Sequence, residues 1–393
     1  MRRVYLDHNA TTPVHPDVVT AMLPFLHERF GNASSVHAYG QEAKQALEGA
    51  RETVAAALGA RKDEITFTSG ATEADNLAVA GVAGALCDKG RHIVTSKIEH
   101  PAVLATCKHL AGLGFEVTEV PCDSSGIVNP AEVQKAIRKD TTLISVMHVN
   151  NEVGTIQPIE EIGEIARKRG VVFHTDAVQS LGKVGLDMKK AKVDLLSLSA
   201  HKIYGPKGVG ALFVRRGTPL SPLIFGGAHE RKRRAGTENV PGIVGLAKAV
   251  EIVTRDIESS NAQMLALRKK LEEGIMSSVS HVRLNGHPEK RVAGTANFSF
   301  ELVEGESMLL SLDMDGIAVS SGSACSSGSL EPSHVLIAMG VSPEIAQGSV
   351  RVSLGRDTTE EDVDYLLGVL PPIVERLRSM SPLFRSSGAG GSQ

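Results

Sequence analysis

The alternation of strand-like and helix-like segments between about residues 50 and 215 is the feature that most restricts the fold of this chain. Short apolar runs with the composition of buried strands are separated by amphipathic runs that fit helices. The predicted strands are 64–68 (EITFT), 92–95 (HIVT), 143–148 (LISVMH), 171–175 (VVFHT) and 195–199 (LLSLS). Such alternation predicts a mostly parallel α/β sheet covered by helices on both faces.

The pattern changes after Gly236, where apolar residues between Val250 and Leu271 recur at helical spacing and predict one long connecting helix. Strands are then expected at 295–302 and 349–354, and a capping box at 358–361 opens a final helix. We therefore predict a large α/β domain and a smaller α+β domain. The expected bounds are 15–257 for the large domain and 1–14 with 258–393 for the small one, with a flexible Ser- and Gly-rich tail from about residue 381.

The composition is that of a soluble globular protein, with 42% hydrophobic and 22% charged residues among 393. The net charge of −3 argues against a general nucleic-acid binder. No apolar run approaches the ~20 residues that span a membrane, and the N-terminal apolar stretch is too short for a signal peptide. The four cysteines form no CxxC pair, which fits free thiols in a reducing compartment. We expect a cytoplasmic protein that binds neither membrane nor nucleic acid.

A lysine and an aspartate each follow a predicted strand. Lys202 comes after the run 195–199 in a glycine-rich turn, where a lysine that forms a Schiff base would be held rigidly. Asp176 ends the run 171–175, and a carboxylate there needs a cationic or hydrogen-bonding partner, such as the protonated pyridine nitrogen of pyridoxal phosphate (PLP). Gln179, one helical turn later, could reach the phenolic oxygen of the same ring. Taken alone, Lys202 would be interpreted as an ordinary surface lysine, and Asp176 fits a helix N-cap as well as a cofactor contact.

Two further features would open toward the same sheet edge. Ser69-Gly70-Ala71-Thr72 joins a strand to a helix N-terminus, which aims backbone N–H groups at an anion, and Thr72 adds a hydroxyl group. His100 precedes Pro101, which suits the first position of a helix, so its imidazole could stack on a pyridine ring and move protons. Each feature has an ordinary structural explanation, but their joint occurrence favours a PLP site.

Cys325 lies in the segment 320–332, which is small, polar and glycine-rich and cannot pack a core. We therefore expect an exposed mobile loop. A free cysteine in such a loop is a liability unless its reactivity is used.

With these residues, the sequence resembles the group I cysteine desulfurases of the NifS/IscS family, which have the PLP-dependent, aminotransferase-like fold type I. The resemblance runs from Tyr5-Leu6-Asp7-His8-Asn9-Ala10-Thr11-Thr12 to Val350-Arg351-Val352-Ser353. Its most specific motifs are 199–208 (SAHKIYGPKG) and 320–325 (SSGSAC). The segment 233–239 (RRAGTEN) is more similar to the NifS branch. The resemblance implies a seven-stranded, mostly parallel sheet in the large domain, with the Cys325 loop on the small one.

The resemblance also implies a role for each matching residue. Lys202 binds PLP covalently, Asp176 pairs with the pyridine nitrogen, Gln179 contacts the phenolic oxygen and His100 stacks on the ring. The phosphate is held by Ala71, Thr72, Ser199 and His201, and by Thr237 of the other subunit of a homodimer. Asn151 lies near cofactor and substrate, and Arg351 binds the substrate carboxylate.

The implied reaction converts L-cysteine to L-alanine and transfers the sulfur to Cys325 as a persulfide, which a protein partner such as an iron–sulfur scaffold then accepts. The sequence leaves open whether the sulfur serves nitrogenase-type cluster assembly, general iron–sulfur assembly or tRNA thiolation. No resident metal site is expected, although Cys325 could transiently ligate an iron–sulfur cluster with a partner. A selenocysteine lyase or another aminotransferase-like PLP enzyme is the alternative, and alanine formed without a keto-acid acceptor would distinguish desulfuration from transamination.

Overall fold

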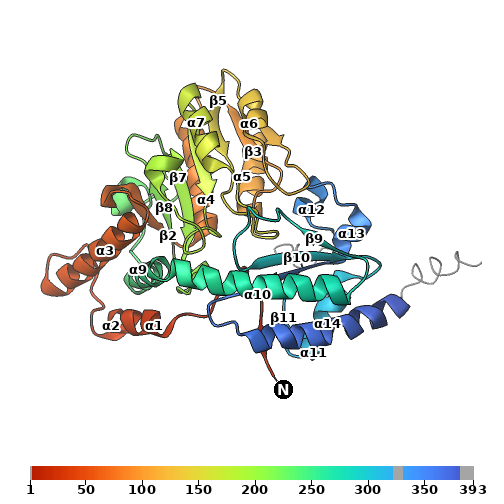
Figure 1. Cartoon of the computed structure of the whole chain (residues 1–393). Coiled ribbons are helices and arrows are strands. Elements are labelled where there is room, and N and C mark those ends of the chain that lie inside the picture. The colour runs from red at the N-terminus through yellow and green to blue at the C-terminus, as the bar shows by residue number, and fades with distance from the viewer. Residues whose placement is uncertain (1, 322–330, 381–393) are drawn as a thin grey trace, which may run out of the picture.

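The structure is a computed structural model that describes residues 2–321 and 331–380. Its centre is a seven-stranded sheet in the order β2-β8-β7-β6-β5-β3-β4 (Figure 1). The strands are β2 (Ile65–Thr68), β3 (His92–Ser96), β4 (Glu116–Val120), β5 (Thr141–Ser145), β6 (Val172–Asp176), β7 (Leu195–Ser199) and β8 (Gly210–Val214). Neighbours from β7 to β4 pair in parallel, whereas β8 is antiparallel to both of its neighbours. The predicted mostly parallel sheet is confirmed.

Helices cover both faces of this sheet. Successive side chains of each strand point to opposite sides, so both sets are buried. Ile93 and Leu143 pack with the buried faces of α4 (Ala71–Ala85) and α5 (Pro101–Gly112). Val94 and Ile144 pack in a larger core on the other side. That core also takes buried side chains from α1 (Pro16–Met22), α3 (Ala38–Ala57), α6 (Pro130–Ala136), α7 (Ile159–Arg169), α8 (Met188–Ala191) and α9 (Val240–Arg255).

The short helices complete the region around the large sheet. They are α2 (Pro24–His27) and the 3-10 turns η1 (Lys62–Glu64), η2 (Ala200–Lys202) and η3 (His229–Lys232). Of these, η2 directly follows β7 and carries Lys202.

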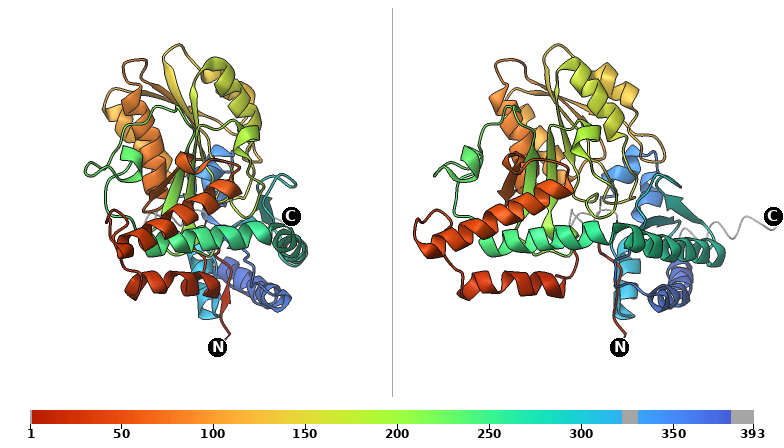
Figure 2. Two further views of the ribbon diagram at one scale, coloured as in Figure 1. Left: turned by 90° about the vertical axis from the view of Figure 1, so that its left-hand side faces the viewer. Right: turned by 60° about the vertical axis from the view of Figure 1, so that its left-hand side comes forward.

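The long helix predicted between Val250 and Leu271 is broken in the structure. Helix α9 ends at Arg255 and α10 (Ile257–Ser278) begins two residues later, with Asp256 between them at φ −100° and ψ 9°. The Asp256 carboxylate accepts hydrogen bonds from Arg255 Nε at 2.7 Å and Arg356 Nη2 at 3.5 Å. The two helices follow one another along one side of the molecule (Figures 1 and 2).

A smaller three-stranded antiparallel sheet, β12-β10-β9, lies beside α10. Its strands are β9 (Val282–Asn285), β10 (Thr295–Phe300) and β12 (Ser349–Ser353), and the helices around it are α11 (Gly305–Met314), α12 (His334–Ala338), α13 (Pro343–Gln347) and α14 (Glu360–Met380). A separate core joins Val4 and Leu6 to this region, because β1 (Val4–Tyr5) pairs with β11 (Ile317–Ala318). Val335 and Leu336 of α12 pack instead into the larger core of the seven-stranded sheet.

The predicted final helix is present, but its capping box lies one residue later than expected. Thr359 Oγ1 accepts from the Asp362 amide at 3.3 Å, and Asp362 Oδ2 accepts from the Thr359 amide at 3.1 Å. The predicted first residue, Thr358, instead accepts from the Gly355 amide at 2.9 Å and so closes the preceding turn. In the described parts of the chain, no helix has the length and apolar character needed to cross a bilayer.

Candidate active site

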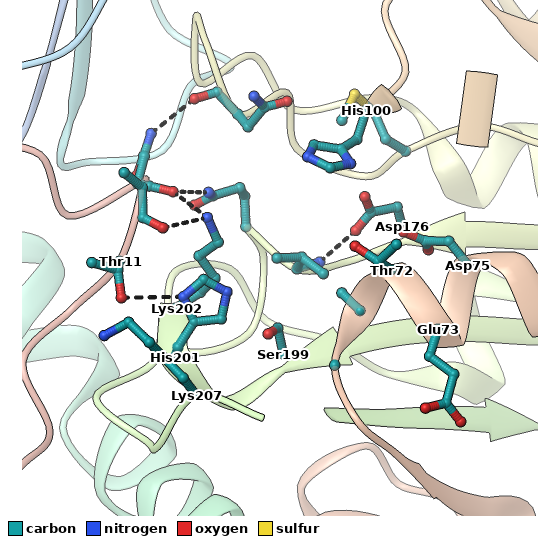
Figure 3. Close-up of a pocket in the computed structure, with 18 of the residues that line it drawn as sticks. Thr11, Thr72, Glu73, Asp75, His100, Asp176, Ser199, His201, Lys202 and Lys207 are labelled. Atoms are coloured by element: carbon teal, nitrogen blue, oxygen red, sulfur yellow. Dashed lines mark hydrogen bonds between the residues drawn. The ribbon is translucent and has the colours of Figure 1, made fainter. Parts of the chain in front are cut away.

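A cavity of about 590 Å³ opens where β3, β6 and β7 end at their carboxyl edges (Figure 3). The structure brings together in its wall most of the side chains predicted from the sequence. These are Ala71, Thr72, His100, Asn151, Asp176, Gln179, Ser199, His201, Lys202 and Arg351. The position agrees with the rule that ligands of open α/β sheets bind outside the carboxyl ends of the strands.

Two predicted residues are not among the lining side chains. Thr237 is exposed in the segment between η3 and α9. Cys325 lies outside the described residues.

The N-terminal segment forms part of the cavity wall, which was not predicted from the strand pattern of the sequence. Lys202 Nζ donates to the backbone carbonyl groups of Asn9 at 2.6 Å and Ala10 at 2.8 Å. The side chain of Asn9 in turn donates from Nδ2 to Thr295 Oγ1 at 2.9 Å. Thr11 Oγ1 lies 3.2 Å from His201 Nδ1. The signal available in the sequence was the mostly polar run Asp7 to Thr12, which follows the short apolar segment 4–6.

Asp176 provides a buried carboxylate on one side of the cavity. Its Oδ1 accepts from the Val178 amide at 2.9 Å (Figure 3). Burial raises the pKa of Asp176, while the nearby His100 and Lys202 act in the opposite direction. A cation placed in the cavity would therefore stabilise the ionised carboxylate.

The N-terminus of α4 provides the opposite kind of group, a set of backbone N–H donors. Its N-cap is Gly70, and no side chain of the described residues caps it. An added Cβ at Gly210 of β8 would lie 2.7 Å from the Gly70 carbonyl carbon, so the turn before α4 packs directly on β8. Ala71 and Thr72 follow in the cavity wall, where free helix N–H groups favour an anion.

Two histidines line the cavity in uncharged form. His100 is the N-cap of α5, and its Nδ1 accepts from the Ala102 amide at 3.1 Å. That bond places the ring proton on Nε2. Burial lowers the pKa of His100, and burial also lowers the pKa of His201 to about 4.

Arg351, from β12, brings a buried guanidinium group to the cavity from the smaller sheet. Its Nη2 donates to Asp7 Oδ1 at 2.7 Å and its Nη1 to the Asn151 carbonyl at 3.1 Å. Its Nε has no hydrogen-bond partner within the described ranges. The arrangement joins both sheets and the N-terminal segment at one site.

Comparison with known proteins places the chain in a family. The aminotransferase class-V family matches residues 4–366. A curated relative from Methanosarcina thermophila, named cysteine desulfurase IscS, is 58% identical over 97% of this chain and 94% of its own length. A second, from Dictyoglomus turgidum and with the same name, is 54% identical over 97% of each chain. A solved structure described as a NifS-like protein is 43% identical with a TM-score of 0.90, covering 96% of this chain and all of that one.

The matches extend over both sheets and over every described residue of the cavity wall. They also agree with the resemblance found in the motifs around Lys202 and Cys325. The chain belongs to the NifS/IscS family of cysteine desulfurases, PLP-dependent enzymes of the aminotransferase class-V fold.

Proposed function

We propose that this cavity converts L-cysteine to L-alanine with PLP and that the sulfur passes to Cys325. The observation that carries the proposal is the meeting of Lys202, Asp176 and the α4 N-terminus in one cavity of about 590 Å³. A lysine, a buried acid and an anion site at these positions match the reactive carbon, the pyridine nitrogen and the phosphate group of PLP.

The residues of the cavity fit this cofactor. The raised pKa of Asp176 shows that its carboxylate is under-stabilised, and a protonated pyridine nitrogen would supply the missing positive charge. Ala71, Thr72, Ser199 and His201 would hold the phosphate, with the free amides of α4 as donors. When bound, PLP supplies an electron sink for the substrate carbon that loses a proton.

Lys202 and His100 are the groups that we assign to proton transfer. Lys202 would bind the cofactor covalently and, once released by the substrate, take the Cα proton of L-cysteine. The Nε2 proton of His100 would be given to the substrate, since Nδ1 is held by the Ala102 amide. Gln179 and Asn151 complete the proposed cofactor contacts.

Arg351 is the proposed binding group for the substrate carboxylate. Its guanidinium group is buried in the cavity wall and already pairs with the carboxylate of Asp7. A substrate carboxylate would make charge-assisted hydrogen bonds with the same fork of donors.

Cys325 would accept the sulfur. Its thiolate would attack the substrate sulfur, forming an S–S bond as the Cβ–S bond breaks. The substrate carbon keeps the electron pair and takes up a proton, which gives alanine. Supporting this role, Ser320 exchanges backbone hydrogen bonds with Arg351 at 2.6 and 3.2 Å, and His334 Nε2 lies 3.0 Å from the Glu99 carbonyl. The described residues on both sides of the segment 322–330 therefore lie next to the cavity.

The chain is further proposed to act as a homodimer with shared sites. Leu26, Phe30 and Val36 are 60%, 68% and 91% exposed, and Phe225 is 82% exposed, which leaves apolar surface uncovered on the single chain. A second copy would cover it and could bring its Thr237 to the phosphate. We also propose a cytoplasmic location, a large domain of residues 15–257 with a small domain of 1–14 and 258–393, and an iron–sulfur scaffold protein as the persulfide acceptor.

The test is product analysis with the purified holoenzyme. L-Cysteine and a thiol reductant should give alanine and sulfide in equal amounts without a keto acid. Cys325→Ala should keep the PLP absorbance and lose sulfide release. Full sulfide turnover by that variant, or a requirement for a keto acid, would contradict the proposal.

A further inference from the structure

Lys183 is a lysine beside the cavity that the proposed reaction does not use. It lies in the loop after β6, and its Nζ donates to Gln179 Oε1 at 2.5 Å and to Asn9 Oδ1 at 3.1 Å. Both partners are neutral amides, and no carboxylate of the described residues forms an ion pair with Lys183. Its contacts are therefore made to two residues of the cavity wall rather than to a counter-ion.

The fold fixes the position of this lysine from two sides. Gly182 has φ +73°, and an added Cβ there would lie 2.6 Å from Val253 Cβ, so the loop packs directly on α9. The Lys183 carbonyl accepts from Asn261 Nδ2 of α10 at 2.8 Å. The ammonium group consequently reaches the cavity wall from a rigid support.

An ammonium group can only donate hydrogen bonds, so it fixes the orientation of both amides. With Oε1 facing Lys183, the Nε2 of Gln179 donates to the Asn9 carbonyl at 2.9 Å. That same carbonyl accepts from Lys202 Nζ at 2.6 Å. Lys183 thus reaches Lys202 through a single intervening residue, Asn9.

The two lysines also influence one another by charge. Burial, followed by the charges of Lys202 and Arg351, lowers the pKa of Lys183 to about 7. Because the interaction is mutual, a charged Lys183 disfavours a positive charge on the Lys202 nitrogen. The charged and titratable groups that share a small pocket or a charge interaction with Lys183 are His8, Lys202, Tyr204, Asp256, Arg351 and Arg356.

We propose that Lys183 is a positioning residue for Lys202, because it orients the amides of Asn9 and Gln179 and its charge favours the uncharged form of the Lys202 nitrogen. The inference rests on the proposed role of Lys202 as the cofactor lysine. It assigns a function to a partly buried ammonium group whose desolvation is otherwise only a cost.

The test compares Lys183→Met, which removes charge and donors, with Lys183→Arg, which keeps both. Lys168→Met, at an exposed position of α7, is the control. The absorbance of bound PLP is titrated with pH in substrate-free enzyme, and kcat and KM for L-cysteine are measured. For Lys183→Met we expect the titration midpoint to rise by about 1 pH unit. We expect kcat to fall about tenfold with little change in KM. Substrate binding should be little affected because Lys183 does not line the cavity of about 590 Å³.

Lys168→Met should titrate like the unaltered enzyme, and Lys183→Arg, which stays charged at every pH, should have a midpoint equal to or below that of the unaltered enzyme. A Lys183→Met midpoint equal to that of the unaltered enzyme would overturn the proposal, even if kcat fell, because loss of packing alone would explain the fall. If Lys183→Met does not fold, Lys183→Gln, which removes the charge and keeps an N–H donor, decides: a raised midpoint supports the role, and an unchanged midpoint overturns it. An unaltered enzyme that binds no PLP or forms no alanine would contradict the proposed function itself, independently of these variants.

Discussion

The carboxyl group of Asp75 lies 3.6 Å from Nε2 of His174 in the fully buried interior next to Asp176. The two residues are not a salt bridge. Burial, and next the charge of Asp176, raises the pKa of Asp75 well above its usual value, and burial lowers the pKa of His174 to about 3. Burial thus favours the uncharged form of both side chains, and we assign them that form, with the charge of Asp176 further disfavouring ionisation of Asp75.

Replacing Asp75 with Asn tests this assignment, because asparagine has the same shape and no charge. We expect the free energy of unfolding at pH 7 to change by less than about 1 kcal/mol, since a neutral side chain replaces a neutral one. Urea unfolding followed by circular dichroism gives this value. A change of more than about 3 kcal/mol would indicate a charged Asp75 paired with His174.

Glu99 predicts a pH dependence of stability. Burial raises its pKa to about 8 from an ordinary value of 4.5, so between these pH values the folded state holds a proton that the unfolded state releases. Stability from this group is complete below pH 4.5 and is lost as the pH rises toward 8, with a slope of at most about 1.4 kcal/mol per pH unit.

Glu99→Gln should remove that slope. Relative to the unaltered protein, the variant should be more stable at pH 8 than at pH 5. Urea unfolding at both pH values measures the difference, and exposed Glu375→Gln serves as the control. Parallel pH curves for Glu99→Gln and the unaltered protein would show that Glu99 does not hold its proton.

Substitution of Arg351 should weaken substrate binding. Arg351→Lys keeps the charge but loses the planar fork, and we expect kcat/KM for L-cysteine to fall about 100-fold. PLP absorbance without substrate should be retained, because Arg351 is not among the proposed cofactor ligands. Arg283→Lys, at an exposed position of β9, should leave both properties unchanged. Normal kcat/KM in Arg351→Lys would exclude the proposed carboxylate contact.

A buried ion pair fixes the segment that leads to Thr237. Arg51 donates to both carboxylate oxygens of Glu230 at 2.7 and 2.8 Å, and each side chain is 3% exposed. Glu230→Gln leaves a buried guanidinium group without its counter-charge and should cost about 3–5 kcal/mol of unfolding free energy. The measurement is the midpoint of thermal unfolding, which Glu230→Gln should lower. Glu52→Gln, which breaks the exposed pair with Lys62, should leave this midpoint unchanged. Equal midpoints for the two variants would contradict this interpretation.

Substitution of Gly210 should lower the affinity for PLP. A methyl group there would lie 2.6 Å from the Leu198 carbonyl oxygen and 2.7 Å from the Gly70 carbonyl carbon, so Gly210→Ala must displace the turn before α4. We expect PLP to dissociate about tenfold more readily, as measured by equilibrium dialysis. Gly185→Ala has open space for its methyl group and is the matched control. Equal affinities would show that the turn adjusts without moving the amides.

The sequence predicted the parallel strands of the sheet better than its irregular parts. Strands such as β5 and β7 are apolar on both faces, which produces a continuous hydrophobic run. Strand β8 was missed because it follows a glycine-rich turn and begins with Gly210 and Ala211, two residue types that are depleted in strands. The break at Asp256 was missed because apolar spacing continues across it, and only the tertiary contact with Arg356 marks it.

The site could be predicted where a polar residue ends a strand, as at Asp176, because strand ends meet at one sheet edge. Asn9 and Lys183 could not, because their roles depend on a contact between the first residues of the chain and the loop after β6. Such long-range contacts leave no periodic pattern in the sequence. For Cys325, which lies outside the described residues, the persulfide role stays a prediction.

The contact between Asp7 and Arg351 joins residues 344 positions apart, and β1 pairs with β11 more than 300 residues away. During translation the first ten residues leave the ribosome long before β11 and β12 exist, so they must wait for their partners. The substrate-binding wall can therefore form only after β11 and β12 have been synthesised. A nascent chain that already contains Lys202 would have the sheet edge but not the complete active site.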